Sequence, residues 1–333
     1  MKNFIEQLPK VELHLHIEGS LEPELMFELA KRNNIKLPFV NVEEVRAAYQ
    51  FSNLQDFLDI YYAGCNVLIT EQDFYDLAFA YYKKAKEQNI IHSEIFFDPQ
   101  SHTDRGIAIE TVVNGLRRAM KDAEQQFGIT GHLILSFLRH LSEQEAIETL
   151  KSVEGMKDEF IAVGLDSSEV GNPPQKFQKV YKMAAEQGYL KVAHAGEEGP
   201  AQYIWDSMSL LNIDRLDHGN RAMDDEKLLQ DLKEKEMGLT LCPLSNLKLQ
   251  VVKDLRNHPL KKMLDLGLKA TVNSDDPAYF GGYMNENFIA IQEALNLNKE
   301  DLFTLTNNAI DVSFASNEHK QEMRKQLSAY FTV

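Results

Sequence analysis

Eight short apolar runs, rich in β-branched residues, constrain the fold of this chain more than any other feature. Helical patterns separate them, and one begins with Ser142 and Glu145 in the spacing of a capping box. Strands that alternate with helices form parallel sheets with helical crossovers, and eight such units predict a closed (β/α)8 TIM barrel of the α/β class. The predicted strands are Val11–His16, Ile90–Phe97, His132–Leu138, Ile161–Leu165, Leu190–His194, Arg215–His218, Leu239–Cys242 and Lys269–Val272.

A long gap, roughly residues 20–89, separates the first two predicted strands. It has helical periodicity and many aromatic residues, including Phe51, Phe57, Tyr61, Tyr62, Phe74 and Tyr75. We expect this segment to form an inserted helical lid beside the mouth of the barrel. Most of these aromatic side chains are expected to pack helices together, so only those nearest the mouth would touch a ligand. One domain over residues 1–333 then accounts for the whole chain.

The net charge of the chain narrows the class of ligand. Against 35 basic residues there are 51 acidic ones, which gives a formal net charge of −16 at pH 7. This charge opposes binding to nucleic acid and favours a small neutral or cationic ligand. No stretch approaches the roughly 20 apolar residues that span a bilayer, and the N-terminus lacks the basic and apolar regions of a signal peptide. We therefore expect a cytoplasmic protein without a membrane or nucleic-acid partner.

Two histidines, His14 and His16, lie two residues apart in the first predicted strand. Side chains at this spacing point from the same face of a strand, so one metal ion can bind both. A half-buried strand that happens to carry two histidines is the ordinary alternative for an isolated pair. Here, however, three more polar segments follow later predicted strands: His194–Glu197, Asp217–Gly219 and Asn273–Pro277. Their shared position at strand ends favours a metal site on the rim of the barrel.

The donor types at this rim favour zinc. Three neutral imidazoles and one carboxylate form a shell of nitrogen and oxygen donors suited to one Zn²⁺, with Fe²⁺, Mn²⁺ or Co²⁺ as substitutes. Such a metal would lower the pKa of a bound water from 15.7 toward about 7. The candidate ligands at the strand ends are His14, His16, His194 and one of the adjacent Asp275 and Asp276.

Three further polar side chains accompany these ligands. Glu197 lies three residues after His194, so a helical turn there would bring its carboxyl near the metal, and we expect it to donate a proton. A shell of four protein ligands leaves no position for His218, so we expect this histidine to act as the base or to orient the hydroxide. Asp275 and Asp276 are adjacent, and adjacent side chains in extended backbone diverge, so we expect one of them to reach the metal and the other to face the ligand. Each of these residues, taken alone, could have an ordinary structural role. Such separate roles explain the joint pattern less well than a metal site does.

The ordered segments His-x-His, His-Ala-Gly-Glu, His-Gly and Asp-Asp-Pro resemble the motifs of the adenosine and AMP deaminase family of metal-dependent barrels. The match covers most of the chain. The resemblance implies that the zinc ligands are His14, His16, His194 and Asp275. It implies that Glu197 is the proton donor and that His218 assists hydroxide attack. It also implies that Asp276 contacts the purine near N7, and that Gly196 and Gly219 keep the metal-side loops close.

Departures from the nucleoside-acting members of that family indicate a smaller substrate. Glu18 stands where those enzymes usually have Asp against the ribose 5′ hydroxyl, and its longer side chain would crowd the sugar space. Ser168 and Glu169 belong to the segment that replaces a glycine-containing loop near purine N3, and a family Arg is replaced within Glu94–Pro99. These features resemble the branch that acts on the free base, because groups in the sugar space would exclude a nucleoside.

The resemblance thus implies zinc-dependent hydrolytic deamination of adenine to hypoxanthine and ammonia, in purine salvage. The side chains expected to contact the substrate are Asp276, Glu18, Ser168, Glu169 and Gly196. Deamination of adenosine, or of a modified adenine such as an N6-substituted or halogenated base, is the nearest alternative. A zinc-containing barrel that binds purine without turnover is the non-enzyme alternative, although it would need neither Glu197 nor His218.

Two other metal-dependent folds are less compatible with the chain. The cytidine-deaminase fold requires a Pro-Cys-x-x-Cys segment, which is missing. A two-metal barrel hydrolase with a carboxylated lysine is disfavoured because the strand Ile161–Leu165 contains no lysine.

Overall fold

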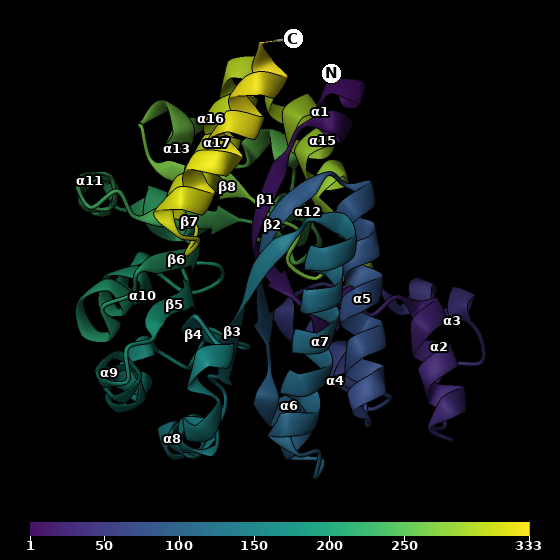
Figure 1. Ribbon diagram of the computed structural model, residues 1–333. Helices are drawn as coiled ribbons and strands as arrows, with labels where there is room; N and C mark the ends of the chain where they lie inside the picture. The colour runs from purple at the N-terminus through teal and green to yellow at the C-terminus, as the bar shows by residue number, and fades with distance from the viewer. Residues whose placement is uncertain (333) are drawn as a thin grey trace.

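A computed structural model describes residues 1–332, and its eight parallel strands follow one another in sequential order around a barrel (Figure 1). The predicted TIM barrel is therefore confirmed, and each strand begins and ends within two residues of its predicted position. The strands are β1 Lys10–His16, β2 Ile90–Phe97, β3 Thr130–Leu138, β4 Ala162–Asp166, β5 Leu190–Ala195, β6 Arg215–His218, β7 Gly238–Leu241 and β8 Lys269–Val272.

Backbone hydrogen bonds close the barrel between β1 and the segment that follows β8. The amide of His16 donates to the carbonyl of Asp275 at 3.0 Å, and the amide of Asp275 donates to the carbonyl of His14 at 3.0 Å. The first strand and the last polar segment of the sequence therefore meet at one point of the rim. This closure places Asp275 beside the two histidines of β1.

Helices surround the strands. The α-helices are α1 Lys2–Gln7, α2 Pro23–Arg32, α3 Val42–Ala48, α4 Leu54–Cys65, α5 Glu71–Glu87, α6 Pro99–Thr103, α7 Ile109–Phe127, α8 Glu143–Ser152, α9 Gln178–Glu186, α10 Ala201–Asp206, α11 Glu226–Glu234, α12 Pro243–Lys248, α13 Leu260–Asp265, α14 Pro277–Phe280, α15 Met284–Leu295, α16 Lys299–Val312 and α17 Asn317–Phe331. Shorter helical segments are η1 Glu18–Ser20, η2 Glu154–Glu159, η3 Pro174–Phe177, η4 Ser207–Leu211, η5 Asn220–Asp224 and η6 Leu255–Asn257.

The buried faces of these helices follow the helical period. In α7, the side chains of Val112, Leu116 and Ala119 are all buried and lie on one side of the helix. The capping box predicted at Ser142 and Glu145 is present at the start of α8. The Ser142 side chain accepts from the Glu145 amide, and the Glu145 carboxylate accepts from the Ser142 amide in return, which satisfies two donors at the helix end.

The segment between β1 and β2 forms the helices α2 to α5, which occupy different places. Helix α5 packs against α7 and β2, as the crossover helix of the first β/α unit. Helices α2 and α3 project to one side of the barrel (Figure 1). Helix α4 alone among the four contributes side chains to the cavity at the carboxyl ends of the strands. Phe57 and Tyr61 of α4 line this cavity, whereas Phe74 of α5 packs in the core.

The two ends of the described chain lie side by side at the opposite end of the barrel (Figure 1). The rings of Phe4 in α1 and Tyr330 in α17 are 4.9 Å apart between centroids, and the Tyr330 hydroxyl donates to the Phe4 carbonyl at 2.7 Å. Within residues 1–332, no helix has the length and apolar character needed to cross a membrane.

Candidate active site

The four side chains predicted to bind a metal converge where β1, β5 and the segment after β8 end. Oδ1 of Asp275 lies 3.3 Å from Nε2 of His14 and 3.5 Å from Nε2 of His16. Nε2 of His16 is in turn 3.2 Å from Nε2 of His194. All four side chains are buried. His16 thus joins the cluster through Asp275 and His194, but it is not among the four residues whose ligand atoms all lie within 4.8 Å of one another.

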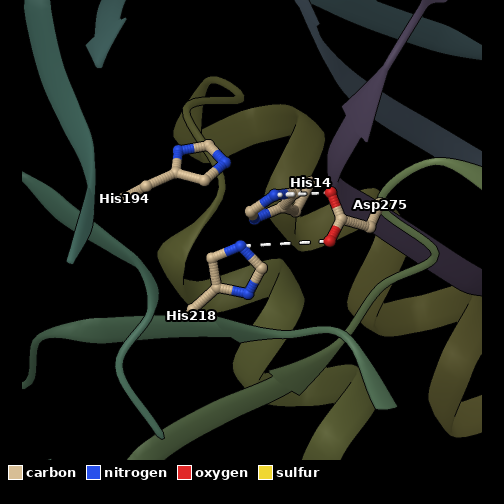
Figure 2. A group of neighbouring side chains, drawn as sticks. All are labelled: His14, His194, His218 and Asp275. Carbon is tan, nitrogen blue, oxygen red and sulfur yellow. Dashed lines mark ion pairs between the residues drawn. The ribbon is translucent and has the colours of Figure 1, made fainter. Parts of the chain in front are cut away.

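His218 approaches the same cluster from the end of β6 (Figure 2). Its ring, those of His14 and His194, and the Asp275 carboxylate place ligand atoms within 4.8 Å of one another. Nε2 of His218 lies 3.9 Å from Oδ2 of Asp275, whereas His14 faces Oδ1. The two oxygens of Asp275 thus face different imidazoles, so this carboxylate can contact a metal ion and a base at once.

A hydrogen-bond chain behind His14 orients its ring. The Thr240 hydroxyl donates to Oδ1 of Asp217 at 2.9 Å, so its oxygen is free to accept from Nδ1 of His14 at 2.8 Å. The ring hydrogen of His14 then resides on Nδ1, and the lone pair of Nε2 points toward Asp275. Outer partners of this kind fix the tautomer of metal-binding histidines.

Glu197 and His218 face each other beside the cluster, with Oε2 of Glu197 3.5 Å from Nε2 of His218. Burial and the nearby Asp275 carboxylate raise the pKa of Glu197 well above its ordinary range. Burial and the neighbouring His14 lower the pKa of His218 to about 3. These shifts favour a protonated carboxyl beside a neutral imidazole, which is the arrangement of a proton donor and a proton acceptor.

The pKa values of the neighbours Asp275 and Asp276 shift in opposite directions. Burial alone would raise the pKa of Asp275, but the imidazoles of His14 and His218 hold it well below its ordinary range. Burial and the charge of Asp275 raise the pKa of Asp276 well above its ordinary range. Oδ1 of Asp276 has no hydrogen-bond partner among residues 1–332. Its side chain packs over Gly19, where a Cβ atom would lie only 1.9 Å from Oδ1.

Left-handed backbone recurs at the strand ends that form the site. Ser167 after β4, His218 in β6 and Asp275 after β8 have φ values of 74°, 64° and 65°. Residues other than glycine rarely adopt this conformation, which costs about 1–3 kcal/mol and persists only where the surrounding structure requires it. All three residues line the same cavity.

A narrow cavity opens in front of the cluster, and its walls are partly apolar and partly charged. Helix α4 and residues 249 and 280 supply apolar side chains, and the strand ends supply carboxylates and imidazoles. The lining residues are His16, Leu54, Phe57, Leu58, Tyr61, Tyr62, Asp98, Asp166, Ser167, His194, Glu197, His218, Leu249, Asp275, Asp276 and Phe280.

The carboxylate of Glu169 holds the loop that carries Glu197. Its Oε1 accepts from the amide of Gly196 at 2.6 Å, and its Oε2 accepts from the amides of Glu197, Glu198 and Gly199 at 3.0, 2.9 and 2.9 Å. The loop is a bend rather than the helical turn considered from the sequence, since α10 begins only at Ala201.

The remaining residues expected to contact substrate do not line the cavity. Oε1 of Glu18 accepts from Nε2 of His102 at 2.8 Å and from the amide of Asp98 at 3.2 Å. The Ser168 hydroxyl donates to Gln55 at 2.9 Å. Gly196 has a φ of 69°, and a Cβ there would lie 2.5 Å from Ile204, so glycine is needed for the close approach of the loop.

Sequence reasoning missed Asp98, which lines the cavity directly after β2, and Thr240, which orients His14. Asp98 was detectable in principle, because it is a polar residue that follows a predicted strand, as the recognised site residues do. Thr240 carries no such signal, since a threonine inside an apolar strand is ordinary.

Comparisons with known proteins agree with this geometry. The sequence profile of the adenosine deaminase family matches residues 9–330. A protein of Hahella chejuensis called adenine deaminase is 58% identical over 330 residues, which is 99% of each chain. One of Rhodospirillum rubrum with the same name is 61% identical over 326 residues, which is 98% of each chain.

Solved structures show the same relation. The crystal structure of an adenine deaminase from Arthrobacter aurescens superposes with a TM-score of 0.97 at 48% identity, over 98% of this chain and 100% of that one. An amidohydrolase from Burkholderia ambifaria with bound zinc superposes with a TM-score of 0.92 at 27% identity, over 99% and 92% of the two chains. A cluster of histidines and an aspartate at the barrel rim, and a family profile that spans nearly the whole chain, lead to one assignment. The chain belongs to the adenosine deaminase family of metal-dependent enzymes.

Proposed function

We propose that this chain catalyses the hydrolytic deamination of adenine to hypoxanthine and ammonia, as a step of purine salvage. Near full-length identities of 58 and 61% to proteins called adenine deaminase support the choice of substrate. The observation on this chain that carries the proposal is the pairing of Glu197 with His218 at 3.5 Å, beside a metal-binding cluster in one cavity. A proton donor and a proton acceptor on one side of a metal site suit the addition of water to a carbon–nitrogen double bond.

The metal is proposed to be one Zn²⁺ bound by His14, His16, His194 and Asp275. Nε2 of His14 is buried and has no hydrogen-bond partner within the described chain, although it faces the Asp275 carboxylate at 3.3 Å. An unpartnered nitrogen beside an oxygen donor fits a cation, and imidazole-rich sets favour zinc, with Fe²⁺, Mn²⁺ and Co²⁺ accepting the same donors. When bound, the metal supplies Lewis-acid polarisation and lowers the pKa of water.

Glu197 is proposed to donate its proton to N1 of the bound purine. Burial and the Asp275 carboxylate raise its pKa, which favours the protonated carboxyl that a proton donor needs. Protonation of N1 withdraws electrons from C6 and makes that carbon more susceptible to attack. The hydrogen bonds from loop 196–199 to Glu169 hold Glu197 at the cavity wall.

His218 is proposed to take the proton of the water that attacks C6. Its lowered pKa means that the imidazole is neutral and able to accept. The new C6–O bond makes C6 tetrahedral, and His218 returns the proton to the amino group. The C6–N bond then breaks, ammonia leaves, and the hydroxyl proton on C6 passes back to Glu197. Water and adenine thus yield hypoxanthine and ammonia, with both side chains restored.

Asp276 is proposed to hold the ring at N7. It lines the cavity with Oδ1 free of protein partners, and its raised pKa favours the protonated form, which donates to an acceptor nitrogen. Helix α4 is proposed to serve as the lid, because Phe57 and Tyr61 cover the cavity opposite the strand ends.

The test follows the ultraviolet absorbance of adenine, and separately of adenosine, with zinc-loaded protein and a metal-free control. Conversion of adenine at a rate far above that of adenosine supports the proposal. Preference for adenosine would make the chain a nucleoside deaminase, and turnover of neither would direct the search to modified adenines. Loss of activity in the metal-free protein and recovery on adding Zn²⁺ would establish the metal requirement.

A further inference from the structure

The carboxylate of Asp217 lies behind the metal-binding cluster and takes no part in the proposed proton transfers. It belongs to β6, and its side chain has no exposed surface. Backbone pairing aligns Asp217 with His194 of β5 on one side and with Thr240 of β7 on the other. Aligned residues of neighbouring strands point from the same face of a sheet, so the three side chains form a row. The row places one carboxylate between a proposed metal ligand and the threonine that orients another, His14.

The two oxygens of Asp217 face different histidines. Oδ1 accepts from the Thr240 hydroxyl at 2.9 Å, and that hydroxyl in turn accepts from Nδ1 of His14 at 2.8 Å. Oδ2 lies 3.8 Å from Nδ1 of His194, and neither of these two atoms has a hydrogen-bond partner among residues 1–332. Buried polar atoms without partners are rare and destabilising. A nitrogen and an oxygen that face each other and both lack partners indicate a hydrogen bond that a small rotation of the His194 ring would complete.

The surroundings of Asp217 favour its ionised form, which accepts at both oxygens. Burial raises the pKa of Asp217, but His14, Arg215 and the Thr240 hydroxyl all act against this shift. Nε of Arg215 lies 3.9 Å from Oδ1 and has no hydrogen-bond partner in the described chain. A guanidinium stays charged in proteins, so it stabilises the carboxylate beside it.

We propose that Asp217 is a positioning residue that sets the ring hydrogens of two metal ligands, those of His14 through Thr240 and of His194 directly. The inference rests on the proposed function, because it concerns the proposed metal. With both ring hydrogens on Nδ1, the Nε2 lone pairs of the two rings are free on the side of the metal-binding cluster. Only a nitrogen without a hydrogen can bind a metal, so the tautomer decides whether each ring can serve as a ligand. One carboxylate thus prepares two of the four proposed ligands.

Asp217→Asn tests the inference, because it keeps the shape of the side chain but replaces one acceptor by a donor. If the new amide group faces His194, it donates to Nδ1 and favours the ring hydrogen on Nε2. If it faces Thr240 instead, the hydroxyl is turned to donate to Nδ1 of His14, with the same result in that ring. We expect the affinity for Zn²⁺ to fall about 10- to 100-fold. Competition between the metal-free protein and a coloured zinc chelator measures this affinity without any substrate.

Thr240→Val tests the branch to His14 separately, since it removes the hydroxyl and leaves Asp217 in place. Its affinity for Zn²⁺ should fall by about 10-fold, whereas Thr240→Ser keeps the hydroxyl and should bind as the wild type does. Thr271→Val is the matched control, because Thr271 of β8 is equally buried and its hydroxyl donates to the Leu239 carbonyl at 3.0 Å. Its affinity should equal that of the wild type.

Wild-type affinity for Zn²⁺ in either Asp217→Asn or Thr240→Val overturns the inference. Denaturant unfolding of the metal-free variants distinguishes a merely structural role, which would lower only the free energy of unfolding and leave the affinity unchanged. Should Asp217→Asn not fold, Thr240→Val decides, with Thr240→Ser as its reference, by a weakened or an unchanged affinity. Failure of the wild-type protein to bind Zn²⁺ would instead refute the metal site of the proposed function.

Discussion

Replacing Glu169 with alanine tests whether a single carboxylate holds the loop that carries Glu197. The Glu169 side chain accepts four backbone hydrogen bonds from residues 196–199. Three of the four donors belong to buried residues, Gly196, Glu197 and Gly199, and Glu198 is half-buried. The alanine variant would leave the three buried amides without an acceptor.

The magnitude follows from these contacts. An unsatisfied buried donor costs about 1–3 kcal/mol, so three give roughly 3–9 kcal/mol. Entry of water and relaxation of the loop favour the lower part of that range, and we expect a loss of about 3–5 kcal/mol in the free energy of unfolding. Turnover should fall by about 10²-fold as well, because a shift of about 1 Å in a reacting group has an effect of that size.

Denaturant unfolding and steady-state kinetics on metal-loaded protein measure the two effects. Glu169→Gln is the matched control, because it keeps the shape of the side chain and the Oε1 acceptor but loses the acceptor shared by three amides. Its stability should lie between those of wild type and alanine variant. A stable Glu169→Ala variant whose only defect is a raised KM would refute this reasoning and make Glu169 a substrate contact, as expected from the sequence.

Three other variants test separate parts of the site and the barrel. Glu197→Gln should retain metal and bind purine but lose about 10²- to 10⁴-fold in turnover, and near-normal turnover would remove Glu197 from the role of acid. His16→Ala should lower the metal content measured by atomic absorption well below one ion per chain, and full retention contradicts its role as ligand. Burial alone would raise the pKa of Glu94, but Arg215 and His92 lower it to about 2, so its stabilising effect is present above pH 4.5 and is lost as the pH falls toward 2. Glu94→Gln should therefore be about 3 kcal/mol less stable than wild type at pH 7, with the difference narrowing at lower pH in unfolding experiments, and a difference independent of pH would contradict the shift.

The barrel could be predicted from the sequence because its determinants are local. A buried parallel strand needs a continuous apolar run, and each of the eight runs forms a strand. The polar segments after the strands then meet at one rim by topology alone, which is why the convergence of His14, His194 and Asp275 was foreseeable.

The supporting contacts were not predictable, because they depend on side-chain directions across distant strands. Glu169 and Ser168 were expected to face the substrate, yet Glu169 turns toward the amides of residues 196–199 and Ser168 toward Gln55. Glu18 turns toward His102, which lies 84 residues away in the chain. Spacing along the sequence does not determine which of two nearby partners a flexible carboxylate meets. Only the packed barrel, with its strands in register, resolves that choice.

Buried carboxylates toward the two ends of the barrel differ in the hydrogen-bond donors that they receive, and this difference supports a ligand in the cavity. Toward the amino ends of the strands, Glu94 accepts from Arg215, His92 and the Phe314 amide. At the carboxyl ends, Asp98 and Asp276 each have an oxygen without a partner among the described residues. A carboxyl group removed from water without a donor destabilises the fold, and the same barrel supplies donors to Glu94. The unpartnered carboxyl oxygens of Asp98, Asp166 and Asp276 all belong to residues that line the cavity, where a ligand with its own hydrogen-bonding groups would supply the missing donors.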